Sequence, residues 1–155
     1  MQLRRLTSAD KEVYRKVLEW DASNPRWWRE AEAVYGEDTL DVFLDNADDP
    51  TNYIDVLVGN NEAVVSFHRV QGKEWEIFLS APRKSNAKLI TEAGARLCDE
   101  ILAMGVADTI CAWINKKNRG VRECLQEVGF ILTGVTALKS DGKKIYTWQH
   151  LNYSS

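Results

Sequence analysis

A cationic segment precedes a stretch with helical spacing in this sequence. Within residues 82–88, Arg83, Lys84 and Lys88 are cationic, and Ser85 and Asn86 are typical helix N-cap residues whose side chains could reach a phosphate. A helix N-terminus adds unpaired backbone N–H groups and the positive end of the helix dipole. Glycines, which let phosphate oxygens approach the backbone, do not occur in this segment. The sequence therefore leaves open whether the segment binds a phosphate.

His68 is a second candidate for chemistry. It alternates with Phe67 in a predicted strand, so the two side chains point to opposite faces, and a Phe67 in the core would place His68 on the other side of the sheet or in a cleft. The residue is either a hydrogen-bonded structural histidine or a base. With only two histidines, far apart, we expect no metal site. Ser66 and Ser80 lie in no G-x-S-x-G motif, which argues against a serine hydrolase.

An aromatic and basic cluster surrounds Trp27 and Trp28. Two adjacent tryptophans on one helix cannot both face the same core, so one of them is expected to reach a groove or a partner. The alternative is ordinary helix packing with one tryptophan partly exposed.

Alternation and turn residues predict strands, and apolar residues at spacings of three and four predict helices. A first helix is expected after Thr7-Ser8-Ala9-Asp10, a second over residues 27–46 with an interruption at Gly36, and two more over 87–104 and 119–128. The expected strands are residues 2–6, 53–58, 63–70, 75–81, 106–114, 130–138 and 144–151.

Composition favours one compact domain. The 155 residues are 45% hydrophobic and 28% charged, and 20 basic against 23 acidic side chains give a net charge of -3. This balance argues against a general nucleic-acid binder, and no run of 18 apolar residues suggests a membrane span. Three widely spaced cysteines are expected to be reduced, buried thiols, which favours a cytoplasmic location.

The order of elements resembles that of the GNAT-type N-acetyltransferases over nearly the whole chain. A more specific match is Asn118, followed by an amphipathic helix and then by Gly129-Phe130. Gly129 can adopt the left-handed conformation that caps a helix, and Phe130 can then re-enter the core. The resemblance implies a single GNAT-like α/β domain over residues 1–155. Its mixed, mostly antiparallel sheet would have about six or seven strands flanked by about four helices.

The resemblance also implies acetyl-coenzyme A, or another acyl-coenzyme A, as co-substrate, with no metal. The family binds it between the strands expected at 75–81 and 106–114, with the pyrophosphate on the N-terminus of the intervening helix. The family's glycine-rich loop corresponds here to the glycine-free segment 82–88. The implied cofactor-binding residues are Leu79, Ser80, Ala81, Arg83, Lys84, Ser85, Asn86, Ala87, Lys88 and Asn118.

For catalysis, the resemblance implies direct attack of an amine on the thioester. Glu76 corresponds to the family's frequent base, and a solvent-facing Glu paired with Lys73 or Arg69 is the alternative. Leu125 stands seven positions after Asn118, where many members have a tyrosine that protonates the leaving thiolate. Tyr146, Tyr153 and Ser80 are conceivable substitutes for that acid.

The acceptor would be a small-molecule amine or a peptide, held near Trp27, Trp28 and Tyr35. Homodimer formation is common in the family. The alternative function is a catalytically inactive GNAT-fold binding or structural module, which the missing glycines and Leu125 favour.

Overall fold

The computed structural model describes residues 1–21, 32–82, 86–115, 123, 126–127, 130–138 and 144–151, with the backbone alone at residues 21, 87, 113–115, 131–138 and 144–151. The chain packs as two compact units. The first comprises Met1–His68 and Phe78–Asn86, and the second comprises Arg69–Ile77 and Ala87–Ser155.

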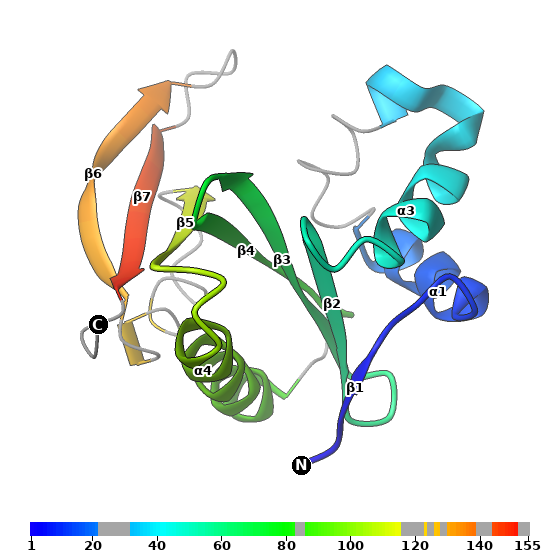
Figure 1. Ribbon diagram of the computed structural model, residues 1–155, viewed down its shortest axis with the longest axis horizontal. Helices are drawn as coiled ribbons and strands as arrows, with labels where there is room; N and C mark the ends of the chain where they lie inside the picture. The colour runs from blue at the N-terminus through cyan, green and yellow to red at the C-terminus, as the bar shows by residue number, and fades with distance from the viewer. Residues whose placement is uncertain are drawn as a thin grey trace. The chain divides into compact units, whose positions relative to one another are not determined.

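Seven strands form one sheet in the order β1-β2-β3-β4-β5-β7-β6 (Figure 1). The β4–β5 pair is parallel, whereas β1–β2, β2–β3, β5–β7 and β6–β7 are antiparallel. The expected mixed, mostly antiparallel α/β fold is therefore confirmed. The strands are β1 (Leu3–Arg5), β2 (Tyr53–Val58), β3 (Ala63–Gln71), β4 (Glu74–Ser80), β5 (Thr109–Asn115), β6 (Ile131–Leu138) and β7 (Lys144–Leu151).

The helices lie where the sequence spacing predicts them. Among the described residues they are α1 (Lys11–Asp21), α3 (Thr39–Ala47) and α4 (Ala87–Ala103), with a 3-10 turn, η1 (Gly36–Asp38), directly before α3, and residues 32–35 are also helical. Gly36 has a φ of +57°, so the interruption expected there is confirmed. Residues 123, 126 and 127 are helical, in agreement with the helix expected at 119–128.

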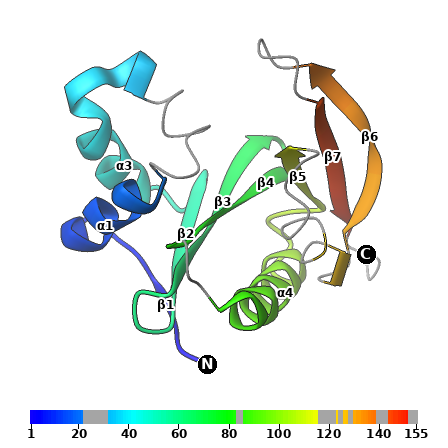
Figure 2. The ribbon, with the colours of Figure 1, turned by 180° about the vertical axis from the view of Figure 1, so that it is seen from behind.

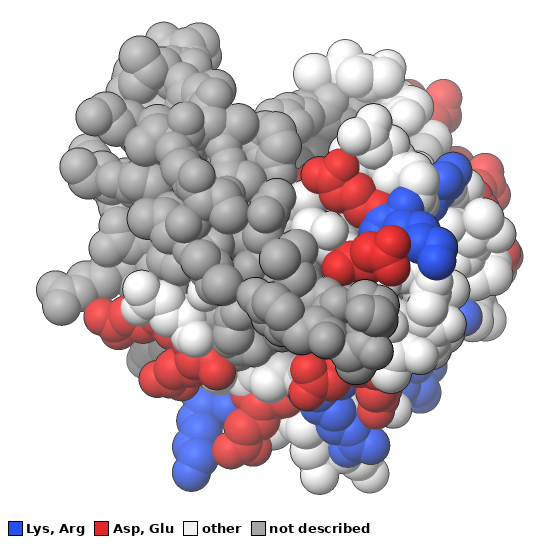
Figure 3. Space-filling view, turned by 60° about the vertical axis from the view of Figure 1, so that its left-hand side comes forward, with Lys and Arg blue, Asp and Glu red and all other residues white. Residues whose placement is uncertain are grey.

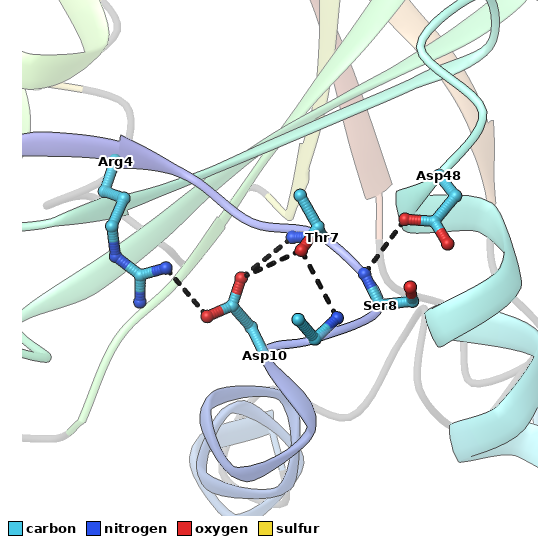
Figure 4. A network of polar contacts seen from close by, with 6 residues as sticks. Arg4, Thr7, Ser8, Asp10 and Asp48 are labelled. Atoms are coloured by element: carbon cyan, nitrogen blue, oxygen red, sulfur yellow. Dashed lines mark hydrogen bonds and ion pairs between the residues drawn. The ribbon is translucent and has the colours of Figure 1, made fainter.

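A capping network fixes the start of α1 (Figure 4). The backbone N–H of Ala9 donates to Oγ1 of Thr7 at 3.3 Å, and the N–H of Thr7 donates back to Oδ2 of Asp10 at 2.9 Å. These bonds pair the backbone N–H groups of the turn that leads into the helix. Arg4 adds an ion pair to Asp10 at 2.7 Å, and the N–H of Ser8 donates to Oδ1 of Asp48 at 3.0 Å.

The helices α1 and α3 cover one face of β2 and β3 in the first unit (Figures 1 and 2). Leu57 and Val64 are register partners and therefore share a sheet face. Both are buried in a cluster with residues from both helices. That cluster consists of Leu6, Tyr14, Val17, Ala47, Leu57 and Val64.

In the second unit, α4 connects the parallel strands β4 and β5, which need a long crossover between them. Its buried side chains include Leu97, Cys98 and Ile101, at helical spacing. The strand expected from residue 106 begins only at Thr109. Gly105, with a φ of +75°, ends the helical region, and the carbonyl of Val106 accepts a 3.1 Å hydrogen bond from the Trp75 indole.

Acidic and basic side chains lie intermixed on the face shown in Figure 3, without a single-sign patch over the described elements. No helix among the described residues has the length and apolar composition needed to cross a bilayer.

Candidate functional site

Strand β4 carries the predicted base Glu76 and the predicted cofactor-binding residues Leu79 and Ser80. Its side chains alternate, so Glu74, Glu76, Phe78 and Ser80 share one strand face, and Trp75, Ile77 and Leu79 share the other. Trp75 and Ser80 are both about 1% exposed, whereas Glu76, Leu79 and Ala81 are half-buried. Ser80 is therefore enclosed by protein at the end of the strand.

The pairing between β4 and β5 is short. Residues 74–76 pair with residues 109–111, which are the first three residues of each strand. Beyond these pairs, β4 continues to Ser80 and β5 continues to Asn115. Residues 77–80 of β4 and residues 112–115 of β5 therefore lie beyond these pairs.

Glu76 lies beside a buried thiol. It is the register partner of Cys111, whose S–H group donates to Oε1 of Glu74 at 3.2 Å and to the Trp75 carbonyl at 3.3 Å. Burial, reinforced by the negative charges of Glu74 and Glu76, raises the pKa of Cys111 to about 12. Cys111 is therefore a protonated thiol at neutral pH and has no nucleophilic character.

A buried polar group joins three elements of the first unit. Asp55 on β2 is 8% exposed, and its Oδ2 accepts a 2.6 Å hydrogen bond from the Tyr14 hydroxyl on α1. Nε2 of His68 on β3 lies 3.9 Å from Oδ1 of Asp55, which is an ion-pair distance. Phe67 is fully buried on the opposite face, so the expected alternation of Phe67 and His68 is confirmed.

The protonation states within this group follow from its contacts. Burial opposes ionisation of Asp55, but interactions with His68 and with the hydroxyls of Tyr14 and Ser66 prevail and lower the pKa of Asp55. Burial and the adjacent Asp55 carboxylate both raise the pKa of Tyr14, so its phenol keeps its proton. Asp55 is thus a buried anion that accepts hydrogen bonds.

Sequence reasoning considered His68 but missed its partners. Asp55 stands in an otherwise apolar strand, Tyr-Ile-Asp-Val-Leu-Val, and a carboxylate there must be hydrogen-bonded if it is buried. This signal was available, but Tyr14 lies 41 residues away from Asp55 in the sequence. Only the strand register and the packing of α1 bring the three residues together.

No protein-family model and no curated protein matches this sequence. Solved structures match over almost the whole chain. One, an acetyltransferase of the GNAT family from Streptococcus pneumoniae, has a TM-score of 0.71 at 16% identity, covering 97% of this chain and 98% of the other. The chain has the GNAT fold.

Two further structures with the GNAT fold have stated activities. A ribosomal L7/L12 alpha-N-protein acetyltransferase in complex with coenzyme A has a TM-score of 0.77 at 12% identity, covering 99% of this chain and 94% of the other. A mutant of spermidine N-acetyltransferase from Vibrio cholerae has a TM-score of 0.70 at 14% identity, covering 98% and 95%. At these sequence identities, the structural similarity shows the fold alone.

The structure describes several of the residues that the GNAT resemblance predicts to bind the cofactor. Asn86 and Lys88 are exposed, and α4 begins at Ala87, at the end of the segment predicted to hold the pyrophosphate. Tyr35, predicted to contact the acceptor, is 45% exposed. Six other predicted site residues lie outside the described residues: Trp27, Trp28, Arg83, Lys84, Ser85 and Asn118.

Throughout the part of the GNAT fold that the structure describes, no three His, Cys, Asp or Glu side chains are arranged to hold a metal ion.

Proposed function

We propose that this chain transfers an acetyl or other acyl group from acyl-coenzyme A to an amine acceptor by direct attack. The observation that carries the proposal is the short β4–β5 pairing within a GNAT fold. Among the described residues, the β4–β5 pairs are residues 74–76 with 109–111, and we propose that the pantetheine amides of the cofactor bond along the remainder of β4 as a partial strand.

In this proposal, the backbone N–H groups of Leu79, Ser80 and Ala81 polarise the thioester carbonyl. Donors fixed in a strand end need no reorganisation as negative charge develops on the carbonyl oxygen. The amine must lose a proton before it attacks. Two groups on the described strands can accept that proton: Glu76, expected from the resemblance, and His68, argued in the next subsection.

The pyrophosphate is proposed to bind at the N-terminus of α4. Its ligands would be the N–H groups of the first helical turn, the side chains of Ser85 and Asn86, and the cationic groups of Arg83, Lys84 and Lys88. Ala87 would offer its backbone N–H, and Asn118 would contact the cofactor or fix the turn that does. No metal takes part in this proposal.

For the acceptor we propose a small-molecule amine or a peptide amine that contacts Trp27, Trp28 and Tyr35. Structures with the same fold carry the names of spermidine and ribosomal-protein acetyltransferases, so both acceptor classes are chemically reasonable. We further propose a cytoplasmic location, which suits the free thiols of Cys98 and Cys111. A homodimer is the proposed assembly.

Calorimetric titration of acetyl-coenzyme A tests this function, with desulfo-coenzyme A and ATP as comparison ligands. We expect micromolar binding that survives moderate salt and is lost in the double variant Lys84→Glu, Lys88→Glu. The matched control is Lys11→Glu, Lys16→Glu, which makes the same charge change at exposed positions of α1 and should bind like the wild type. An absence of binding up to millimolar concentration would instead favour the inactive binding module.

A further inference from the structure

The ring of His68 is held on three sides. Its centroid lies 5.0 Å from that of Tyr53 in an edge-on arrangement and 4.8 Å from that of Phe78 in a tilted one. Nε2 faces the Asp55 carboxylate at 3.9 Å. The side chain remains 25% exposed, so a fixed imidazole retains access to solvent.

Asp55 lies on the Nε2 side of the imidazole. A carboxylate on that side favours the neutral tautomer with its hydrogen on Nε2, so that Nδ1 is the nitrogen that can accept a proton. The Tyr14 hydroxyl, 2.6 Å from the other oxygen of Asp55, holds the carboxylate in place.

Phe78 connects this group with the strand proposed to hold the thioester. It lies on β4 two residues before Ser80, on the same strand face as Ser80, and its ring packs against His68. Tyr14, Asp55, His68, Phe78 and Ser80 all belong to the first unit. The imidazole is therefore anchored beside the end of β4 whose N–H groups would bind the thioester carbonyl.

We infer that His68 is the general base that deprotonates the acceptor amine, with Asp55 and Tyr14 as positioning residues. The inference rests on the proposed acyl transfer. Nδ1 of His68 takes one proton from the acceptor ammonium, and the free amine attacks the thioester carbon. The C–N bond forms and the C–S bond breaks, the coenzyme A thiolate leaves with the electron pair, and the nitrogen releases its second proton to solvent. Solvent takes the proton from the imidazolium and protonates the thiolate.

The alternative base, Glu76, shares its strand face with Glu74, Phe78 and Ser80 and is the register partner of the Cys111 thiol. For His68, the structure shows a carboxylate on one side of the ring and aromatic rings on two others. A buried anion directly behind the imidazole adds the orientation that efficient proton transfer requires.

Among the described residues, Asp55 faces the imidazole of His68, Tyr53 packs on the ring, and Tyr14 and Ser66 bond to the Asp55 carboxylate. In Asp55→Asn we expect kcat to fall while the KM for the acceptor and the affinity for acetyl-coenzyme A stay unchanged, because the imidazole loses the anion that orients it.

The decisive experiment compares His68→Gln and Glu76→Gln in acetyl transfer to spermidine and to a short peptide with a free N-terminus. Thiol release is followed across pH, and the affinity for acetyl-coenzyme A is measured in parallel. We expect His68→Gln to lower kcat about 100-fold or more with cofactor affinity unchanged. Glu76→Gln should lower kcat less than His68→Gln does, and Arg69→Gln, an exposed control on the same strand as His68, should stay within about threefold of the wild type.

The outcomes separate this inference from the proposed function. An active wild type whose His68→Gln variant keeps its rate, or whose Glu76→Gln variant loses it, overturns the role of His68 and leaves acyl transfer standing. A wild type that neither binds acetyl-coenzyme A nor transfers an acetyl group overturns both. If His68→Gln does not fold, His68→Ala with added imidazole replaces it, and recovery of rate with imidazole concentration is the expected result, whereas no recovery overturns the role.

Discussion

The Tyr14 hydroxyl donates a 2.6 Å hydrogen bond to Oδ2 of Asp55, joining α1 to β2 through a buried anion. Burying a carboxylate carries a penalty unless hydrogen bonds replace its water. Tyr14 and Asp55 are 4% and 8% exposed, so water supplies little of that replacement. The bond therefore has a structural role, whether or not His68 next to it acts as a base.

Removing this hydrogen bond should destabilise the protein. In Tyr14→Phe the ring still packs with Val17 and Leu57, but Asp55 loses a buried donor. A hydrogen bond to a charged group contributes about 1.5 to 3 kcal/mol, and we expect that loss in the free energy of unfolding, measured by urea denaturation. Tyr35→Phe, at an exposed position, should change it by less than about 0.5 kcal/mol. Equal effects of the two variants would contradict the structural role.

Asp55 should also make the free energy of unfolding depend on pH in the acidic range. Its pKa is lowered in the folded protein, so its ionised form contributes stability above the ordinary carboxyl pKa, near 4, and this contribution is lost as pH falls through the folded value. Asp55→Asn lacks this titration. The stability difference between wild type and variant, measured by urea denaturation, should therefore shrink from pH 5 to pH 3.

Asp10 and Asp48 also have lowered pKa values, through hydrogen bonds from Arg4 and Thr7 and from Ser8. Both are present in wild type and in Asp55→Asn, so their titration cancels in the comparison. A difference that stays constant between pH 5 and pH 3 would show that Asp55 has the same pKa in the folded and unfolded chains.

Local sequence patterns were sufficient to predict the elements of the fold. The strands at 53–58 and 144–151 have the expected bounds, because alternating residues and turn formers act over a few positions. The strand expected at 106–114 begins three residues late. There the Trp75 indole donates a hydrogen bond to the Val106 carbonyl, a tertiary contact that no local pattern contains.

The candidate site was harder to predict from the sequence than the helices and strands were. Phe67 and His68 could be assigned to opposite faces from alternation alone. The grouping of His68 with Asp55 and Tyr14 depends on the β2–β3 register, which pairs Tyr53 with His68, and on the packing of α1 over β2. Periodicity does not encode such contacts, so His68 could be singled out but its role could not be argued.

Two cysteines should be unreactive in the folded protein. Burial and the charges of Glu74 and Glu76 raise the pKa of Cys111 to about 12, and burial with the nearby Asp99 raises the pKa of Cys98. At pH 8 a thiol with a pKa near 12 is about one part in ten thousand thiolate, the reactive form. Iodoacetamide should therefore label both cysteines slowly in buffer and rapidly in urea, as followed by peptide mass spectrometry. Rapid labelling of Cys111 in buffer would contradict a buried, protonated thiol. Glu74→Gln should accelerate the labelling of Cys111, because it removes one of the negative charges that raise its pKa.

The end of α4 provides a test of backbone conformation. Gly105 follows the helix with a φ of +75°, and its N–H donates to the Leu102 carbonyl at 3.2 Å. A Cβ placed there meets no atom within 4 Å, so the penalty for a side chain is conformational rather than steric crowding by neighbours. Gly105→Ala should lower the free energy of unfolding by about 1 to 2 kcal/mol. Gly105→Asn should cost less, because asparagine enters the left-handed region more readily. Equal stability of the two variants in urea would show that the chain reaches this turn through another conformation.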